Sequence, residues 1–200
     1  MTAARKTPVA LTPQAAPFAI RAERASDLVA REALLDACFG DSRHLRTCQR
    51  LRDGRVPAEG LAFSAVAQGQ LVGTVRLWHV SAGGIPALIL GPLAVYSACR
   101  KLGVGAALMD RALAAARARG HRAVLLLGDA SYYVRFGFSA EKARELQLPG
   151  AFERERLLAL ELVPGALDGA WGMITATGAA ALRRRAARPK KTLRAAAAMA

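Results

Sequence analysis

The sequence predicts an α/β fold with a mixed, mostly antiparallel central sheet flanked by helices. Three observations lead to this fold class: β-rich and helical segments alternate, three β-rich runs follow one another through short turns, and a long helix precedes a further apolar run. With 200 residues, 53% of them hydrophobic, the chain is long enough to form one such core.

The N-terminal elements are a strand over 18–23, a helix over 26–38 and a second short helix over 43–52. Ser26 stands where an N-cap is expected, because apolar residues recur at helical spacing behind it.

Three strands then follow, over 61–67, 71–80 and 87–95. Gln68-Gly69-Gln70 separates the first two, and a turn at 82–84 separates the second from the third. Connections this short join antiparallel neighbours.

A helix over 104–119 leads to an apolar strand over 121–128, which must cross over to reach the sheet. A short helix from Ala130 and a strand over 157–162 complete the pattern.

The chain divides into one domain and two tails. Residues 1–17 are rich in Ala, Pro and Thr without periodicity and predict a flexible N-terminal tail, followed by a folded domain over 18–165 and a C-terminal extension over 166–178. Residues 179–200 hold seven cations and no acid, which predicts a disordered, basic, alanine-rich tail.

Positive charge is not confined to that tail. The chain carries 29 Lys and Arg against 15 Asp and Glu, a net charge of +14, so +7 remains once the seven tail cations are subtracted. Such a balance favours anionic partners.

Cysteine usage and hydropathy exclude several classes of protein. Cys38, Cys48 and Cys99 are odd in number and lack metal-ligand spacing, so we expect no metal site, no disulfide framework and a cytoplasmic location. No apolar run approaches the roughly 18 residues of a spanning helix, and prolines interrupt the N-terminal segment, so neither a membrane partner nor a signal peptide is expected.

The stretch Cys99 to Leu108, "CRKLGVGAAL", joins a predicted strand to a predicted helix. Gly103-x-Gly105 at a helix N-terminus offers free backbone N–H groups to an anion such as a phosphate. The alternative is that the glycines only shape a tight loop. A dinucleotide fingerprint does not fit, since Leu108 occupies its third glycine position, and the Gly-Lys-Ser/Thr of a P-loop is absent.

Two sequence motifs, one following the other along the chain, indicate a more specific function for this stretch. Arg100-Lys-Leu-Gly103-Val-Gly105 matches R/Q-x-x-G-x-G/A and follows "LAV" at 93–95, while "YYVRFGF" at 132–138 supplies Tyr-x-x-x-Gly-Phe. Over residues 18–165 the sequence resembles the GNAT superfamily of acetyl-CoA-dependent N-acetyltransferases, in particular its small bacterial predicted members.

This resemblance implies strands splayed at a cofactor cleft, with acetyl-CoA as the cosubstrate and no metal. The backbone of the "LAV" strand would pair with the pantetheine arm, and the following loop would hold the pyrophosphate. The implied acetyl-CoA-binding residues are Leu93, Ala94, Val95, Arg100, Lys101, Gly103, Val104, Gly105 and Ala106.

The resemblance also implies two catalytic groups. Tyr133, four residues before Gly137, matches the tyrosine that donates a proton to the departing thiolate, and the N–H of Leu93 would polarise the thioester carbonyl. Tyr132 is expected to face elsewhere and to serve in packing.

The acceptor side is less defined. Residues 38–54 are expected to form the acceptor wall, and their arginines and aspartates indicate no charge preference. Candidates for a general base are Glu59, His79, His44 and Asp41, with no basis for choosing one. Direct transfer in a ternary complex is favoured over an acetyl-cysteine on Cys99.

The sequence therefore predicts transfer of an acetyl group to a primary amine of a small molecule or peptide, by a monomer or homodimer. Two alternatives stay open. One is a non-catalytic acyl-CoA sensor, and the other is a nucleic-acid-associated protein acting through weak, salt-sensitive binding by the basic tail.

Overall fold

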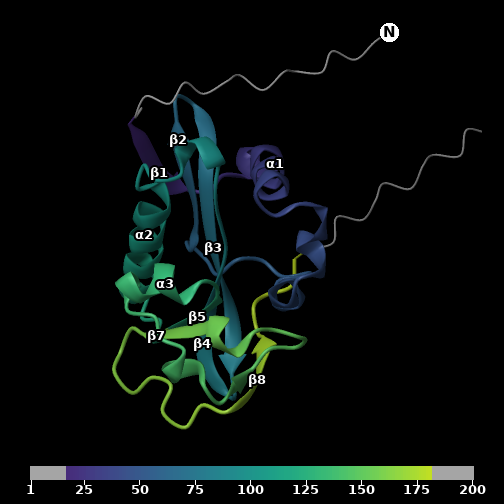
Figure 1. Ribbon diagram of the computed structural model, residues 1–200, viewed down its shortest axis with the longest axis vertical. Helices are drawn as coiled ribbons and strands as arrows, with labels where there is room; N and C mark the ends of the chain where they lie inside the picture. The colour runs from purple at the N-terminus through teal and green to yellow at the C-terminus, as the bar shows by residue number, and fades with distance from the viewer. Residues whose placement is uncertain (1–16, 182–200) are drawn as a thin grey trace, which may run out of the picture.

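The computed structural model describes residues 17–181, which form one layered α/β unit (Figure 1). Its strands are β1 (Phe18–Ala22), β2 (Ala62–Ala67), β3 (Gln70–Ala82), β4 (Ile85–Val95), β5 (Ala123–Leu127), β6 (Leu146–Gln147), β7 (Leu157–Glu161) and β8 (Gly172–Ala176). Its α-helices are α1 (Leu28–Phe39), α2 (Val104–Ala118) and α3 (Ala130–Tyr133). Shorter 3₁₀ helices occupy Ala25–Asp27, Asp41–Leu45, Thr47–Leu51, Ser97–Cys99, Val134–Phe136, Glu141–Ala143 and Arg154–Arg156.

The strands form one sheet in the order β1-β2-β3-β4-β5-β7. Neighbours along this path are antiparallel except for β4 and β5, which are parallel because α2 crosses over between them. The predicted fold class, a mixed and mostly antiparallel sheet, is confirmed.

Helices α1 and α2 cover opposite faces of the sheet (Figure 1). The buried face of α2 carries Val104, Leu108 and Met109 into the main core, and its small alanines let the helix lie close to β2 and β3. On the other face, Leu34 and Leu35 of α1 pack against β3 and β4.

Two local predictions about the first helices are wrong. Ser26 does not cap α1, because the helix starts two residues later, at Leu28, after a short 3₁₀ turn. The Asp27 carboxylate holds that turn, since it accepts hydrogen bonds from the Arg24 N–H and the Ser64 hydroxyl. The single helix expected over 43–52 is two 3₁₀ helices, separated by extended backbone at Arg46.

The C-terminal extension predicted over 166–178 contains β8, which pairs antiparallel with the last residues of β3, beyond the end of β2. Ala179 and Ala181, the start of the predicted basic tail, hydrogen-bond to Val56 and Gly54. The rest of that tail, and the predicted N-terminal tail up to residue 16, lie outside the described residues.

No helix within residues 17–181 is both long enough and apolar enough to cross a membrane.

Candidate functional site

The site lies where β4 and β5 separate. These strands pair only at Leu88 with Val124 and at Ile89 with Leu125, although both strands continue further. Beyond this point β4 bulges, since Leu90 and Leu93 oppose residues of β3 that are only two apart. A bulge breaks the regular ladder and bends the strand, so the sheet opens into a fork.

The free edge of β4 faces into this fork. The N–H of Tyr96 donates to the Val72 carbonyl of β3, and hydrogen-bonded pairs alternate along an antiparallel ladder. The N–H and C=O groups of Leu93 and Val95 therefore point away from β3, toward the opening. The Cys38 thiol reaches the Val95 carbonyl from that side, at 3.4 Å.

The glycine loop provides a set of free donors next to this edge. Gly103 adopts a left-handed conformation, with φ of 79°, and α2 starts directly after it. Within residues 17–181, the N–H groups of residues 103–106 make no backbone hydrogen bond, whereas those of Arg100 and Leu102 donate to the turn before the helix. The donors available to an anion are therefore those of Lys101 and of the helix start, rather than the whole stretch 100–106.

Gly105 brings the two sequence motifs together. It lies inside α2, and a Cβ atom there would stand 2.9 Å from the Tyr132 hydroxyl. That hydroxyl thus rests against the first turn of α2. The expectation that Tyr132 faces away from the site is wrong.

Two adjoining cavities occupy the fork. The smaller, about 480 Å³, contains every residue of the sequence-predicted acetyl-CoA set in its wall except Val104, whose side chain lies in the core. The larger, about 880 Å³, extends toward residues 38–54. Phe39, Leu93, Arg100 and Tyr132 line both cavities, so the free edge of β4 is common to the two spaces.

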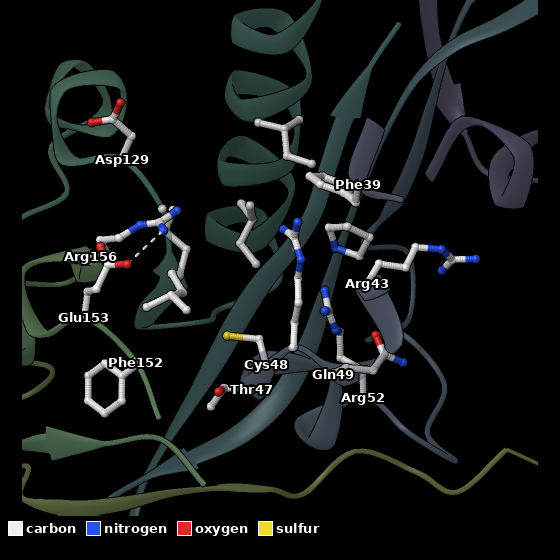
Figure 2. A pocket seen from close by; sticks show the side chains of 18 of the residues that line it. Phe39, Arg43, Thr47, Cys48, Gln49, Arg52, Asp129, Phe152, Glu153 and Arg156 are labelled. Carbon is white, nitrogen blue, oxygen red and sulfur yellow. Dashed lines mark ion pairs between the residues drawn. The ribbon is translucent and has the colours of Figure 1, made fainter. Parts of the chain in front are cut away.

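The wall of the larger cavity comes from segments far apart in sequence (Figure 2). Arg43, Gln49 and Arg52 stand on one side, and Asp129, Glu153 and Arg156 stand on the other. The predicted acceptor segment 38–54 therefore does line a cavity beside Leu93. The sequence analysis did not identify three residues of this wall, because nothing in their local pattern distinguishes them from a surface loop: Phe152, Glu153 and Arg156.

Tyr133 lines the larger cavity at its junction with β5. A Cβ atom on Gly128 would lie 2.3 Å from Cε2 of the Tyr133 ring, so the ring packs directly on the backbone at the end of β5. Burial raises the pKa of Tyr133 to about 12, which keeps the phenol protonated at neutral pH. Tyr132 packs edge-on against it, with ring centroids 5.0 Å apart.

None of the four predicted base candidates lines either cavity. The carboxylates that do so are Asp129 and Glu153. Asp129 follows β5 and caps α3 by accepting from the Ser131 N–H at 3.0 Å, while Glu153 lies 3.7 Å from Arg156.

Two cysteines also lie in these walls. Cys99 lines the smaller cavity and Cys48 the larger. Burial raises the pKa of the Cys48 thiol, so this group is a poor nucleophile at neutral pH. Within the described residues, no group of His, Cys, Asp and Glu side chains is arranged to hold a metal ion.

Comparisons with known proteins agree with this geometry. A family described as an acetyltransferase (GNAT) domain matches residues 58–140. The uncharacterized N-acetyltransferase YhbS of Escherichia coli strain K12 is 30% identical over 162 residues, which cover 78% of this chain and 93% of YhbS.

Two solved structures are also similar. The crystal structure of YhbS from Escherichia coli in complex with CoA has a TM-score of 0.68 and 28% identity, and covers 84% of this chain and 94% of that one. A GNAT family acetyltransferase from Brucella melitensis in complex with acetyl-CoA has a TM-score of 0.58 and 27% identity, and covers 74% and 90%.

Proposed function

Because this chain belongs to the GNAT family of acetyltransferases, we propose that it transfers the acetyl group of acetyl-CoA to a primary amine by direct attack in a ternary complex. The observation that carries this proposal is the fork between β4 and β5. There the free edge of Leu93, the open start of α2 and the Tyr133 side chain border two connected spaces.

The smaller cavity suits acetyl-CoA on physical grounds. The N–H and C=O groups of Leu93 and Val95 offer the backbone pairing that an extended amide-containing chain requires. The free N–H groups at the start of α2 and the positive charges of Arg100 and Lys101 suit a diphosphate. The relatives in complex with CoA and acetyl-CoA support the same ligand.

The reaction needs three groups around the thioester. The neutral amine attacks the carbonyl carbon, so a C–N bond forms as the C–S bond breaks. The N–H of Leu93 stabilises the negative charge that develops on the carbonyl oxygen. The protonated Tyr133 hydroxyl donates its proton to the departing sulfur, giving the free thiol of CoA. The positively charged nitrogen of the tetrahedral intermediate loses one proton as it becomes the amide, and this proton restores the Tyr133 hydroxyl by way of the base.

The base that takes this amine proton is Asp129. Its carboxylate follows Gly128 at the end of β5, beside the Tyr133 ring, and lines the cavity that an acceptor would enter. Glu153 is the other carboxylate in this wall, but it pairs with Arg156 at 3.7 Å.

The experiment is an acceptor screen with wild-type protein, in which thiol release and acetylated products are both measured across amines. Tyr133→Phe should then lower kcat by about 10²-fold or more, the lower end for a general acid. Tyr96→Phe is the matched control, since this third tyrosine of the chain lines neither cavity. Wild-type protein that binds acetyl-CoA but acetylates no amine would contradict the proposal.

A second pair of variants distinguishes the roles of the two carboxylates, Asp129 and Glu153. Asp129→Asn keeps an oxygen that can cap α3 but removes the basic group, so kcat should fall by about 10²-fold or more. Glu153→Gln should leave kcat close to that of wild type. The reverse result would transfer the role of base to Glu153.

A further inference from the structure

Arg52 is one of the arginines that line the larger cavity, together with Arg43, Arg46, Arg100 and Arg156. Two of these are paired: Arg43 binds Glu32 at 2.6 Å and Asp36 at 2.7 Å, and Arg156 lies 3.7 Å from Glu153. Arg46 lies 4.9 Å from the centre of the Phe39 ring, and Arg100 lies at the border with the smaller cavity, where we assign it to the diphosphate.

The described residues give the Arg52 side chain neither an ion pair nor a hydrogen bond, and its Nε atom is buried. Burial lowers the pKa of the Arg52 guanidinium; nearby Cys48 and Asp53 oppose this effect, and the charges of Arg46 and Arg43 add to it. The group nevertheless stays cationic, because arginine does not lose its proton in proteins. Arg52 as a whole is half-buried, so its unpaired guanidinium carries part of the cost of a buried cation, and a well-placed anion would offset that cost.

The position of Arg52 relates it to the reacting centre. Its Nη1 atom lies 3.3 Å from the place that a Cβ atom on Gly91 would take, so the guanidinium lies against the bulge of β4. Gly91 is two residues before Leu93, whose N–H is aimed into the fork. A molecule bound to Arg52 would therefore extend from the bulge toward the thioester position.

The opposite side of the cavity carries two carboxylates, Asp129 and Glu153, and one cation, Arg156, which pairs with Glu153 (Figure 2). Asp129 follows Gly128, whose backbone contacts the Tyr133 ring. An acceptor with an amine at one end and an anion at the other would meet a carboxylate beside Tyr133 and a guanidinium beside Gly91. The planar fork of arginine matches a carboxylate with two parallel hydrogen bonds.

From this arrangement we infer that the acceptor is an amine that also carries a carboxylate, as in an amino acid, and that Arg52 binds the carboxylate. The inference rests on the proposed function and names its substrate class. Arg52 acts as a specificity-determining residue, and the amine of the bound acceptor is directed toward Leu93 and Tyr133.

The test compares matched acceptors with wild-type protein and saturating acetyl-CoA. The panel pairs each α-amino acid with its amide, and pairs glycine, β-alanine and γ-aminobutyrate with their amides to vary the distance between amine and carboxylate. Short peptides with a free C-terminus form a further arm, which separates free amino acids from peptides as the source of the carboxylate. The preferred carboxylate should exceed its amide in kcat/KM by roughly 10- to 100-fold, as for a charged hydrogen-bonded pair.

Variants then assign this preference to one side chain. Arg52→Gln should remove the preference, because it should raise KM for the carboxylate by roughly 10-fold or more and KM for the amide by much less. Arg52→Lys should retain only part of the preference, since an ammonium lacks the fork. Arg117→Gln is the control for net charge, because this arginine is exposed on α2 and lines neither cavity. The thermal shift caused by acetyl-CoA reports whether each variant is folded and binds its cosubstrate.

Two results would overturn the inference while leaving the proposed function intact. One is that wild-type protein acetylates the amino acids and their amides with equal kcat/KM. This result requires no variant, so it can be obtained even if Arg52→Gln does not fold. The other is an Arg52→Gln protein that loses both acceptors in parallel, which would assign Arg52 to acetyl-CoA or to the fold. Failure of wild-type protein to acetylate any member of this panel, together with acetylation of another amine in the wider acceptor screen, would overturn the inference alone. Failure on every amine in both would overturn the proposed function as well.

Discussion

Gly128→Ala tests whether the position of the Tyr133 ring controls catalysis. A Cβ atom at residue 128 would lie 2.3 Å from Cε2 of that ring and 3.1 Å from Cδ1 of Leu126. Carbon atoms in contact are about 3.5–4.0 Å apart, so the ring must move by at least about 1 Å. A displacement of that size at a catalytic group costs on the order of 10²-fold in rate.

The same substitution also overpacks the site, which costs about 1–3 kcal/mol of folding free energy. For a chain of this size that lowers Tm by roughly 2–12 °C. The assays are steady-state thiol release for kcat and thermal unfolding for Tm. We expect acetyl-CoA affinity to change little, because Gly128 and Tyr133 line the larger cavity and not the smaller one.

A double-mutant cycle separates displacement of the hydroxyl from other effects. Phenylalanine at position 133 keeps the ring and its contact with residue 128 but has no proton to donate. In the Tyr133→Phe background, Gly128→Ala should therefore lower Tm as before and leave kcat unchanged. A Gly128→Ala protein with the kcat of wild type would refute the reasoning, and so would an equal loss of kcat in both backgrounds.

Three further predictions concern the loop and two titrating groups. Gly103→Val should weaken acetyl-CoA binding at least about tenfold by calorimetry without unfolding the domain, because a β-branched residue resists the left-handed φ of 79° that starts α2. Lys101→Ala should have a smaller effect, reduced further by salt; normal binding by Gly103→Val would argue against the helix start as the phosphate site. The pKa of Tyr133 is about 12 in the folded protein and about 10 in the unfolded chain. Between pH 10 and pH 12, unfolding therefore releases the Tyr133 proton. The contribution of this group to stability is complete below pH 10 and is lost as the pH rises toward 12. In urea unfolding, the stability difference between wild type and Tyr133→Phe should thus shrink from pH 9 to pH 11; a constant difference would contradict the shift. The hydrogen bond from Arg21 holds the pKa of Asp27 well below its usual range, so this carboxylate stabilises the fold above pH 4 and loses that contribution as the pH falls further. Asp27→Asn should cost about 1–3 kcal/mol at pH 7 and less at pH 3 in the same assay, whereas a larger cost at pH 3 would reverse the sign.

Local patterns in the sequence were sufficient for the family and for the order of the longer strands and helices, but not for β6 and β8. Short turns at 68–70 and 82–84 leave antiparallel pairing as the practical arrangement for β2, β3 and β4, and the structure confirms it. The left-handed conformation of Gly103 and the open start of α2 likewise depend on neighbouring residues alone, so the glycine motif could indicate an anion site in advance.

The acceptor side could not be predicted in the same way. Arg52, Asp129 and Glu153 come from three segments that are separated by 24 or more residues and share no periodic pattern. The sequence left the base among four residues that all lie away from the cavities, because their distance from the thioester depends on how the sheet bends. The parting of β4 and β5 after two residue pairs, together with the bulge at Gly91, creates the space in which these segments meet. Residue types and their spacing determined the free backbone N–H donors at the start of α2. Tertiary packing decided which charged side chains line the same cavity, because long-range contacts depend on the path of every segment between them.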